Sequence, residues 1–106
     1  MKFYFRVVAR EFMESLDERI RNRINRKLEL YGEYGLNYIL RSSYLKKFSE
    51  DLYEVIVLHD YRFLGTMINE DFYLVIGFQK KSQKTPYRMI QYAINIIKKD
   101  KQKLLL

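Results

Sequence analysis

Residues 52–80 read LYEVIVLHDYRFLGTMINEDFYLVIGFQK, and this stretch decides the fold. It contains three runs rich in β-branched and aromatic residues, which are typical of strands. Short polar segments at residues 59–60 and 69–71 separate the runs. Because connections this short join antiparallel neighbours, we predict an antiparallel three-strand meander. The predicted strands are residues 52–58, 61–68 and 72–80; the continuous apolar run 74–76 predicts a central strand that is covered on both faces.

Upstream of the meander, the hydrophobic period changes. Residues 2–9 (KFYFRVVA) predict an opening strand. Apolar residues then recur every three to four positions, which predicts an amphipathic helix with one buried stripe. Ser15 and Glu18 fit a capping box, so we expect a kink or a new helix start near Ser15. The stripe consists of Phe12, Leu16, Ile20, Ile24, Leu28 and Tyr31, and Gly32 and Gly35 end the helix.

Two further segments complete the predicted architecture. Residues 36–49 are apolar without a clean period, so we expect a short second helix or turn that folds back on the first, then a loop through residues 49–51. Thr85 and Pro86 indicate a C-terminal helix, because threonine can cap a helix and proline suits its first turn. Gly77, inside a strand, predicts a bulge or a close backbone approach. The last helix should bury Ile90, Ala93, Ile94 and Ile97.

The composition bounds the organisation and excludes several kinds of site. A chain of 106 residues has the length of one domain, so we expect a single domain over residues 1–106. It has no cysteine and one histidine, which excludes disulfides and a zinc site of the usual kind, and we expect no cofactor and no metal. No apolar run approaches the roughly 20 residues that span a bilayer. Residues 1–10 do not form a signal peptide, so we expect a cytoplasmic protein without a membrane partner.

The net charge of +7 lies entirely in the C-terminal quarter of the chain. Residues 1–78 contain 12 Lys and Arg against 12 Asp and Glu, whereas residues 79–106 contain 8 Lys and Arg against one acid, Asp100. A balanced body with a basic end predicts an electrostatic footprint for an anionic partner. A solvated lysine tail that aids solubility is the alternative.

The run 80–85 (KKSQKT) lies between a predicted strand and a predicted helix N-terminus. Backbone N–H groups at a helix start favour anions, and three lysines add charge to them, so this run is either a phosphate-binding corner or an ordinary solvated loop. Gly-rich phosphate loops and nucleophile elbows are missing from the sequence. We interpret Glu54 as a charge on the strand surface and Asp60 as a turn residue, rather than as a catalytic pair.

A resemblance to a known family rests on the run VIGFQKKSQKTP at residues 75–86, followed by Ala93 in the helix. This run closely resembles the strand-to-helix signature of the HigB branch of the RelE toxin superfamily, including its phage-derived members. Residues 45–55 (LKKFSEDLYEV) resemble the family's approach to its second strand, and residues 11–35 resemble its first helical hairpin. The resemblance implies a small α+β RelE-like domain: an N-terminal strand, a helical hairpin, the antiparallel three-strand meander and a C-terminal helix.

The same resemblance implies the toxin of a type II toxin–antitoxin system. Such a toxin is an endoribonuclease (mRNA interferase) that cleaves mRNA on the ribosome, and its partner is a cognate antitoxin, often a helix-turn-helix protein. The expected chemistry is attack by the RNA 2′-hydroxyl on the neighbouring phosphate. The site must orient that phosphate, neutralise charge on its oxygens and move two protons. Lysine and arginine suit the first two tasks but are poor bases at their ordinary pKa.

Matching positions supply the candidate residues. Arg62 stands where the family has a basic residue on the middle strand, which favours a phosphate contact; the alternative is an exposed strand residue paired with Asp60 or Glu54. The single imidazole, His59, is a candidate proton carrier because its ordinary pKa is near neutral, or it is simply a turn residue. The candidate catalytic residues are Arg62, Lys80, Lys81 and His59, and the candidate RNA-binding residues are Lys84, Thr85 and Arg88; a solvated surface role is the alternative for Arg88.

One position departs from the family pattern. After the run 52–55 (LYEV), many members carry an arginine, whereas this chain has Ile56. That change removes a candidate phosphate contact. It keeps open an alternative function, a catalytically degenerate RelE-like protein that binds an antitoxin or RNA without cleavage. A basic DNA-binding accessory protein has less support, because no recognition-helix pattern is present.

Overall fold

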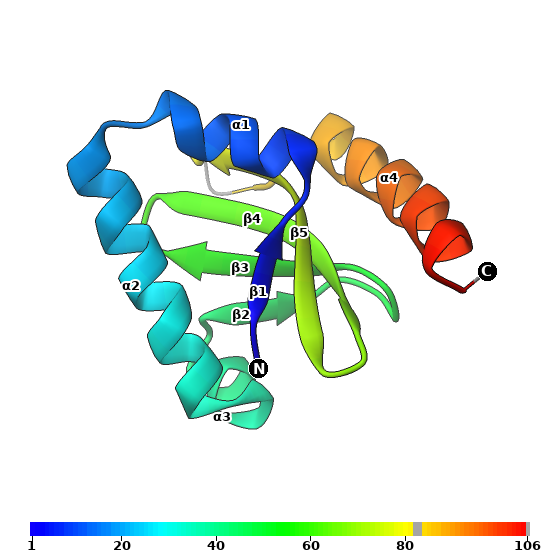
Figure 1. The fold of residues 1–106 in the computed structure, drawn as a ribbon, viewed down its shortest axis with the longest axis horizontal. Helices are drawn as coiled ribbons and strands as arrows, with labels where there is room; N and C mark the ends of the chain where they lie inside the picture. The colour runs from blue at the N-terminus through cyan, green and yellow to red at the C-terminus, as the bar shows by residue number, and fades with distance from the viewer. Residues whose placement is uncertain (82–83, 106) are drawn as a thin grey trace.

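A computed structural model shows one sheet with helices on both of its faces (Figure 1). The structure describes the backbone of residues 1–81 and 84–105 and, within these ranges, the side chains up to residue 101. The strand order is β1-β5-β4-β3-β2, and the predicted α+β class is confirmed. The elements are β1 (Phe3–Phe5), α1 (Val7–Ser15), α2 (Glu18–Tyr34), α3 (Leu36–Arg41), β2 (Leu45–Lys47), β3 (Tyr53–Val57), β4 (Tyr61–Ile68), β5 (Asp71–Gln79) and α4 (Tyr87–Leu105).

The predicted meander is present as β3, β4 and β5, all antiparallel. Two short turns join them, and the two residues at the tip of each turn have positive φ, as the hairpin turns that match strand twist require. Gly77 marks a close approach: a Cβ there would lie 2.6 Å from ring atoms of Phe12 and Phe63. The irregularity in the ladder lies elsewhere, between Leu64 and Gly65 of β4.

The sheet is wider than the meander, because an edge strand is added on each side. β1 pairs parallel to β5, and β2 pairs antiparallel to β3. The short helix predicted after Gly35 is α3, but β2 was not predicted. Its three residues, Leu45 to Lys47, show one buried side chain and two exposed ones, which is too short a pattern to separate from a loop.

Two expectations for the N-terminal third are wrong in detail. The opening strand ends at Phe5, and residues 7–9 already belong to α1, which turns Ala9 into the core. The break near Ser15 is present, but Ser15 does not form a capping box. Its hydroxyl donates to the Phe12 carbonyl, whereas Asp17 caps α2 by accepting from the Ile20 N–H at 3.2 Å. The residue that caps α2 is therefore Asp17, two positions after Ser15.

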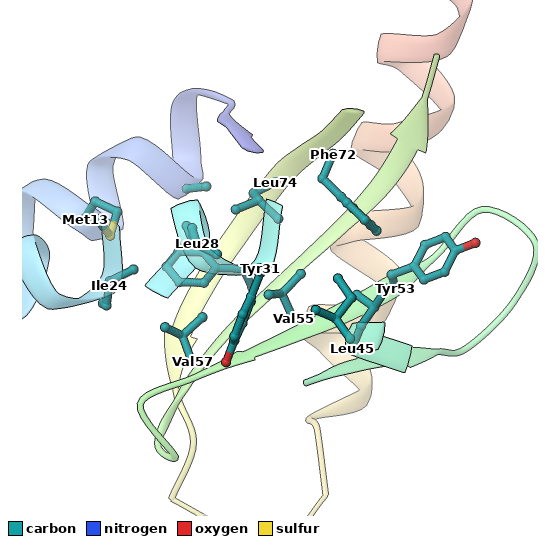
Figure 2. Packing of buried hydrophobic residues seen from close by; sticks show 13 residues of the cluster. Met13, Ile24, Leu28, Tyr31, Leu45, Tyr53, Val55, Val57, Phe72 and Leu74 are labelled. Carbon is teal, nitrogen blue, oxygen red and sulfur yellow. The ribbon is translucent and has the colours of Figure 1, made fainter. Parts of the chain in front are cut away.

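The sheet separates two hydrophobic cores. Helices α1, α2 and α3 cover one face, where Tyr31, Val55 and Phe72 pack into the larger core (Figure 2). Helix α4 covers the other face with a smaller core around Leu64 and Val75. The predicted stripe of α4 is confirmed, since Ile90, Ala93, Ile94 and Ile97 all pack there. Run 74–76 contributes to both cores, as predicted for a covered central strand.

Two ion pairs fix the C-terminal half of α4 to the rest of the domain. Asp100, the one acid of the basic segment, pairs with Arg6 at 2.8 Å, and a second oxygen completes a forked contact at 3.3 Å. Lys101 pairs with Asp51 in the loop before β3. Helix α4 is therefore attached at this end through charge as well as through apolar burial.

Candidate functional site

A buried carboxylate organises the α4 face of the sheet at its basic end. Glu54 is the second residue of β3, and only 1% of its side chain is exposed. Because side chains alternate along a strand, Leu52 and Glu54 point to the α4 face while Tyr53 and Val55 enter the larger core. The interpretation of Glu54 as a surface charge is therefore wrong. A carboxylate this deeply buried requires charged or hydrogen-bonding partners.

Three segments supply those partners. Arg62 of β4 places Nε 3.0 Å from Oε1 of Glu54, and Lys80, just beyond β5, places Nζ 3.8 Å from the same oxygen. Thr85, in the loop before α4, donates from Oγ1 to Oε2 at 2.6 Å. The Arg62 contact is an ion pair without an aligned hydrogen bond from Nε. Glu54 thus gathers two of the candidate catalytic residues and one of the candidate RNA-binding residues.

The β-sheet register explains why Arg62 reaches Glu54. Arg62 pairs with Ile56, and Leu64 pairs with Glu54, so Arg62 and Glu54 are diagonal neighbours on one face. The remaining contacts of the guanidinium lie at the β3–β4 turn, where Nη1 donates to the carbonyl oxygens of His59 at 2.6 Å and Tyr61 at 3.2 Å. With 13% of its side chain exposed, Arg62 connects the turn to the buried carboxylate instead of extending into solvent.

His59 has the opposite environment. It stands at the tip of the β3–β4 turn with 95% of its side chain exposed, and its Nδ1 lies 3.0 Å from Oδ1 of Asp60. An imidazole whose Nδ1–H is taken by a carboxylate presents its Nε2 lone pair outward, which is the arrangement of a general base. Leu58 and His59 have φ of 50° and 70°, a left-handed conformation that costs residues with a side chain about 1–2 kcal/mol each.

The turn and the end of β5 are held together by the backbone. The N–H of Lys80 donates to the carbonyl of Asp60 at 2.7 Å. This bond places His59, Arg62 and Lys80 in one corner of the domain, which we call the basic corner and define by these three residues with Lys81. Lys81 follows directly and is exposed.

The candidate RNA-binding residues Lys84, Thr85 and Arg88 do not share one environment. Thr85 does not cap the last helix, because its hydroxyl is bound to Glu54 and α4 begins later, at Tyr87. The first helical N–H bonds, from Met89 and Ile90, go to the carbonyl of Pro86. Lys84 and Arg88 are exposed beside this start. Residues 82–83 of the KKSQKT run and the C-terminal leucines 104–106 lie outside what the structure describes in full.

The net charge at the basic corner is positive. The carboxylate of Glu54 neutralises one of the two partly buried cations, Arg62 or Lys80, and the exposed Lys81 and Arg88 add to the remaining positive charge. Within the described ranges, no group of three His, Cys, Asp or Glu could hold a metal ion. The arrangement can therefore bind an anion and, through His59, exchange a proton with it.

A buried tyrosine meets the basic corner from the other face of the sheet. Tyr31 of α2 donates from its hydroxyl to the Ile56 carbonyl at 2.7 Å, and Figure 2 shows that hydroxyl at the rim of the larger core. Burial is the main cause that raises the pKa of Tyr31 to about 12; the neighbouring Tyr44 and Tyr34 act in the same direction, and the positive charge of Arg62 acts in the opposite direction. Ile56 thus lies between Tyr31 and Arg62, at the position where the resemblance leads us to expect the arginine of many RelE/HigB-like proteins.

The alternative pairing of Arg62 with Glu54 is present, although Arg62 is not exposed; the sequence did not predict the burial of Glu54 or the contact of Tyr31. One signal was available for Glu54, because it is a single acid inside the apolar run 53–57. Such an acid is expected to be buried with a charged partner, and the next strand carries Arg62. No comparable signal marked Tyr31, because its position in the apolar stripe predicts only burial. Its hydroxyl contact depends on where α2 crosses the sheet edge.

The chain matches the model of a known protein family. The family model described as phage-derived Gp49-like protein (DUF891) matches residues 11–98, which covers most of the chain and all of β2 to β5. No curated protein matches the chain. Among the helices that the structure describes, none is long and apolar enough to cross a membrane.

Proposed function

We propose, from the premise that this chain belongs to the phage-derived Gp49-like family, that it is the toxin of a type II toxin–antitoxin system of the RelE/HigB type. Its activity would be ribosome-dependent cleavage of mRNA in the cytoplasm, and a cognate antitoxin, expected to be a helix-turn-helix protein, would block it. The observation that carries the proposal is the basic corner, where His59, Arg62 and Lys80 meet although they come from different strands and turns.

Each residue of the basic corner has a role in this proposal. Lys80 and Lys81 would neutralise the phosphate oxygens, and Arg62 would hold the turn and add positive charge behind it. His59, with Nδ1 bound to Asp60, would take the proton of the attacking 2′-hydroxyl at Nε2. The leaving 5′-oxygen needs a proton in return, and a lysine ammonium or the ribosome would provide it.

Two observations support a second candidate, a degenerate relative that binds an antitoxin or RNA without cleaving. The Nε and Nη1 atoms of Arg62 already face Glu54 and two backbone carbonyls, so only part of the guanidinium remains for a phosphate. Ile56 provides no charge at the pair position opposite Arg62. In this function the basic corner is retained for binding alone.

The test measures growth and mRNA integrity after expression of the chain by itself, with cleavage on purified ribosomes as the direct assay. The proposal expects growth arrest, cleaved mRNA and rescue by the antitoxin. Loss of cleavage in the His59→Ala variant, with unchanged folding by circular dichroism, would support the assigned role. Normal growth and intact mRNA at high soluble expression would overturn the interferase proposal in favour of the non-cleaving function, and Ile56→Arg would then be the variant in which to seek restored cleavage.

A further inference from the structure

Helix α2 keeps its positive and negative charges apart. Residues 19–27 (RIRNRINRK) contain five cations and no acid, whereas the acids of the helix are Glu18, Glu29 and Glu33. Glu29 and Glu33 are four residues apart, so they share one row of the helix, and both line a groove between α2 and β1. The acids after residue 27 are therefore turned toward β1.

Four of the five cations form a second row on the helix surface. Positions 19, 23 and 27 follow one another at intervals of four residues, and position 26 lies beside them, so the row extends about 12 Å along the axis. All four side chains are exposed. We call this row the cation flank, and its members are Arg19, Arg23, Arg26 and Lys27. The fifth cation, Arg21, is not part of it, because it donates to the carbonyls of Glu14 and Leu16 at the end of α1.

Few acids are near enough to neutralise the cation flank. Asp17 and Glu18 precede it, and the Asp17 carboxylate already accepts the Ile20 N–H as the helix cap. Glu29 follows Arg26 by three residues but lines the groove with β1. Among the side chains that the structure describes, none of the four cations forms an ion pair. The cation flank therefore presents an excess of positive charge to solvent.

The chemistry of the cation flank favours a nucleic acid over a protein partner. Residues 8–33 are all described, and none of them is an exposed large apolar side chain, whereas protein interfaces have an apolar or aromatic core. Three of the four cations are arginines, whose planar fork binds two phosphate oxygens at once. Interfaces with nucleic acid are more polar and more positively charged, as this surface is.

The same surface fits a double helix better than a single strand. Proteins bind single strands in grooves that offer aromatic rings to the bases. Tyr31 is the one aromatic residue of α2 before Tyr34, and it is buried, so the cation flank has no ring for stacking. Double-helical RNA is recognised mostly by its shape and its phosphates, which requires cations alone.

The cation flank is separate from the basic corner. Tyr31 follows Lys27 by one helical turn and donates to the Ile56 carbonyl, so α2 crosses β3 three residues before His59 (Figure 1). Arg62, in contrast, contacts Glu54 on the face of the sheet that α4 covers. The sheet therefore lies between the two basic surfaces, and one RNA strand at Arg62 does not explain the charge on α2.

We propose that the cation flank of α2 binds the phosphate backbone of a double-helical RNA while the basic corner receives the strand to be cleaved. The inference rests on the proposed RNA-directed function and adds a second RNA-binding surface to it. Binding through phosphates alone carries no sequence preference, so the cation flank contributes affinity and orientation.

The experiment measures binding of a fluorescent, fully paired RNA duplex to the full chain at several salt concentrations. Arg23→Gln/Lys27→Gln should weaken binding and lower the slope of log affinity against log salt by up to about 1.8, since each duplex phosphate contact contributes about 0.9. The matched control, Lys98→Gln/Lys99→Gln, removes two exposed charges from α4 and should lower the slope by much less. Folding should be retained, because glutamine is as good a helix former as arginine or lysine, and circular dichroism checks this.

Two further measurements test the assigned chemistry. Arg23→Lys/Arg26→Lys keeps the charge but removes two forks, so it should weaken duplex binding with little change in the salt slope. Binding of a single-stranded oligoadenylate should be the same in wild type and in Arg23→Gln/Lys27→Gln. Polyglutamate, an anion without phosphates, should compete poorly with the duplex.

The outcomes separate this inference from the proposed function. Equal slope reductions in the α2 and α4 pairs, or a wild type that binds no duplex, would overturn the inference while cleavage of mRNA could still stand. Strong competition by polyglutamate that the α2 pair abolishes would assign the cation flank to an acidic protein instead. A wild type that binds the duplex through the cation flank but cleaves no mRNA would retain the inference and overturn the interferase proposal.

Discussion

The guanidinium of Arg62 donates a 2.6 Å hydrogen bond to the carbonyl oxygen of His59, while its Nε lies 3.0 Å from the buried Glu54. One side chain therefore links the backbone of the turn that carries His59 to the buried carboxylate of Glu54. The turn that carries His59 has left-handed backbone at two residues, and Arg62 helps to hold it there. Arg62 thus has a structural task as well as a charge.

Removing Arg62 should destabilise the domain as well as reduce activity. In Arg62→Ala, Glu54 remains buried with only Lys80 and Thr85, and we expect the free energy of unfolding to fall by about 3–5 kcal/mol. Arg62→Lys keeps the charge but loses the forked donor, so a smaller loss in stability should accompany a loss of cleavage on the order of 100-fold. Urea denaturation and ribosome cleavage measure the two effects.

A double-mutant cycle with Glu54 provides the control. If Arg62 serves mainly to neutralise Glu54, then Arg62→Ala should cost much less in a Glu54→Gln background, and the coupling should be at least about 1 kcal/mol. Thr85→Val removes the 2.6 Å hydrogen bond to Glu54 and should leave this coupling in place. Additive losses from the two changes would show that the carboxylate and the guanidinium do not depend on each other.

The sequence predicted the parts of this site that depend on local patterns, and it did not predict the contacts between residues that are distant in the sequence. Residues 61–68 were predicted as a strand, and β4 spans those residues, because alternation and turn residues are local properties. Glu54 was misplaced because its burial depends on Arg62 and Lys80, which approach it only after the meander forms. The same applies to Thr85. The local sequence predicted a helix cap, but its hydroxyl bonds to Glu54, which is distant in the sequence.

Glycine substitutions in the two hairpin turns should separate strain from chemistry. His59 and Glu70 both have φ near 70°, a conformation that glycine adopts without strain. We expect His59→Gly and Glu70→Gly each to leave stability unchanged or to raise it by up to about 1 kcal/mol. Only His59→Gly should reduce cleavage, by roughly 100- to 10,000-fold, if His59 transfers the proton. Equal cleavage by both variants would remove His59 from the mechanism and leave it as a turn residue.

The hydroxyl of Tyr31 should produce a signature at alkaline pH. Its pKa is raised to about 12 in the folded state, above the ordinary value near 10, so the folded protein retains this proton when the unfolded chain has lost it. The contribution of the neutral hydroxyl to stability is therefore complete below pH 10 and is lost as the pH rises through 12. Tyr31→Phe should be less stable by about 1 kcal/mol at pH 8, and this difference should shrink between pH 10 and 12. A difference that stays constant over that range would show that the Tyr31 hydroxyl is not buried in solution.

Neutralising cations at the two ends of α4 should show whether RNA recognises the basic corner or the net charge alone. Lys81, in the basic corner, and Arg88, beside it, are exposed, whereas Lys98 and Lys99 are exposed near the other end of the helix. The Lys81→Gln/Arg88→Gln and Lys98→Gln/Lys99→Gln pairs change the net charge equally. Each phosphate contact that is lost lowers the slope of log affinity against log salt by about 0.7 for a single strand, so the first pair should reduce it by up to about 1.4 and the second pair by much less. Equal reductions would mean that RNA binds the basic C-terminal segment as a whole, and that the basic corner does not bind phosphate preferentially.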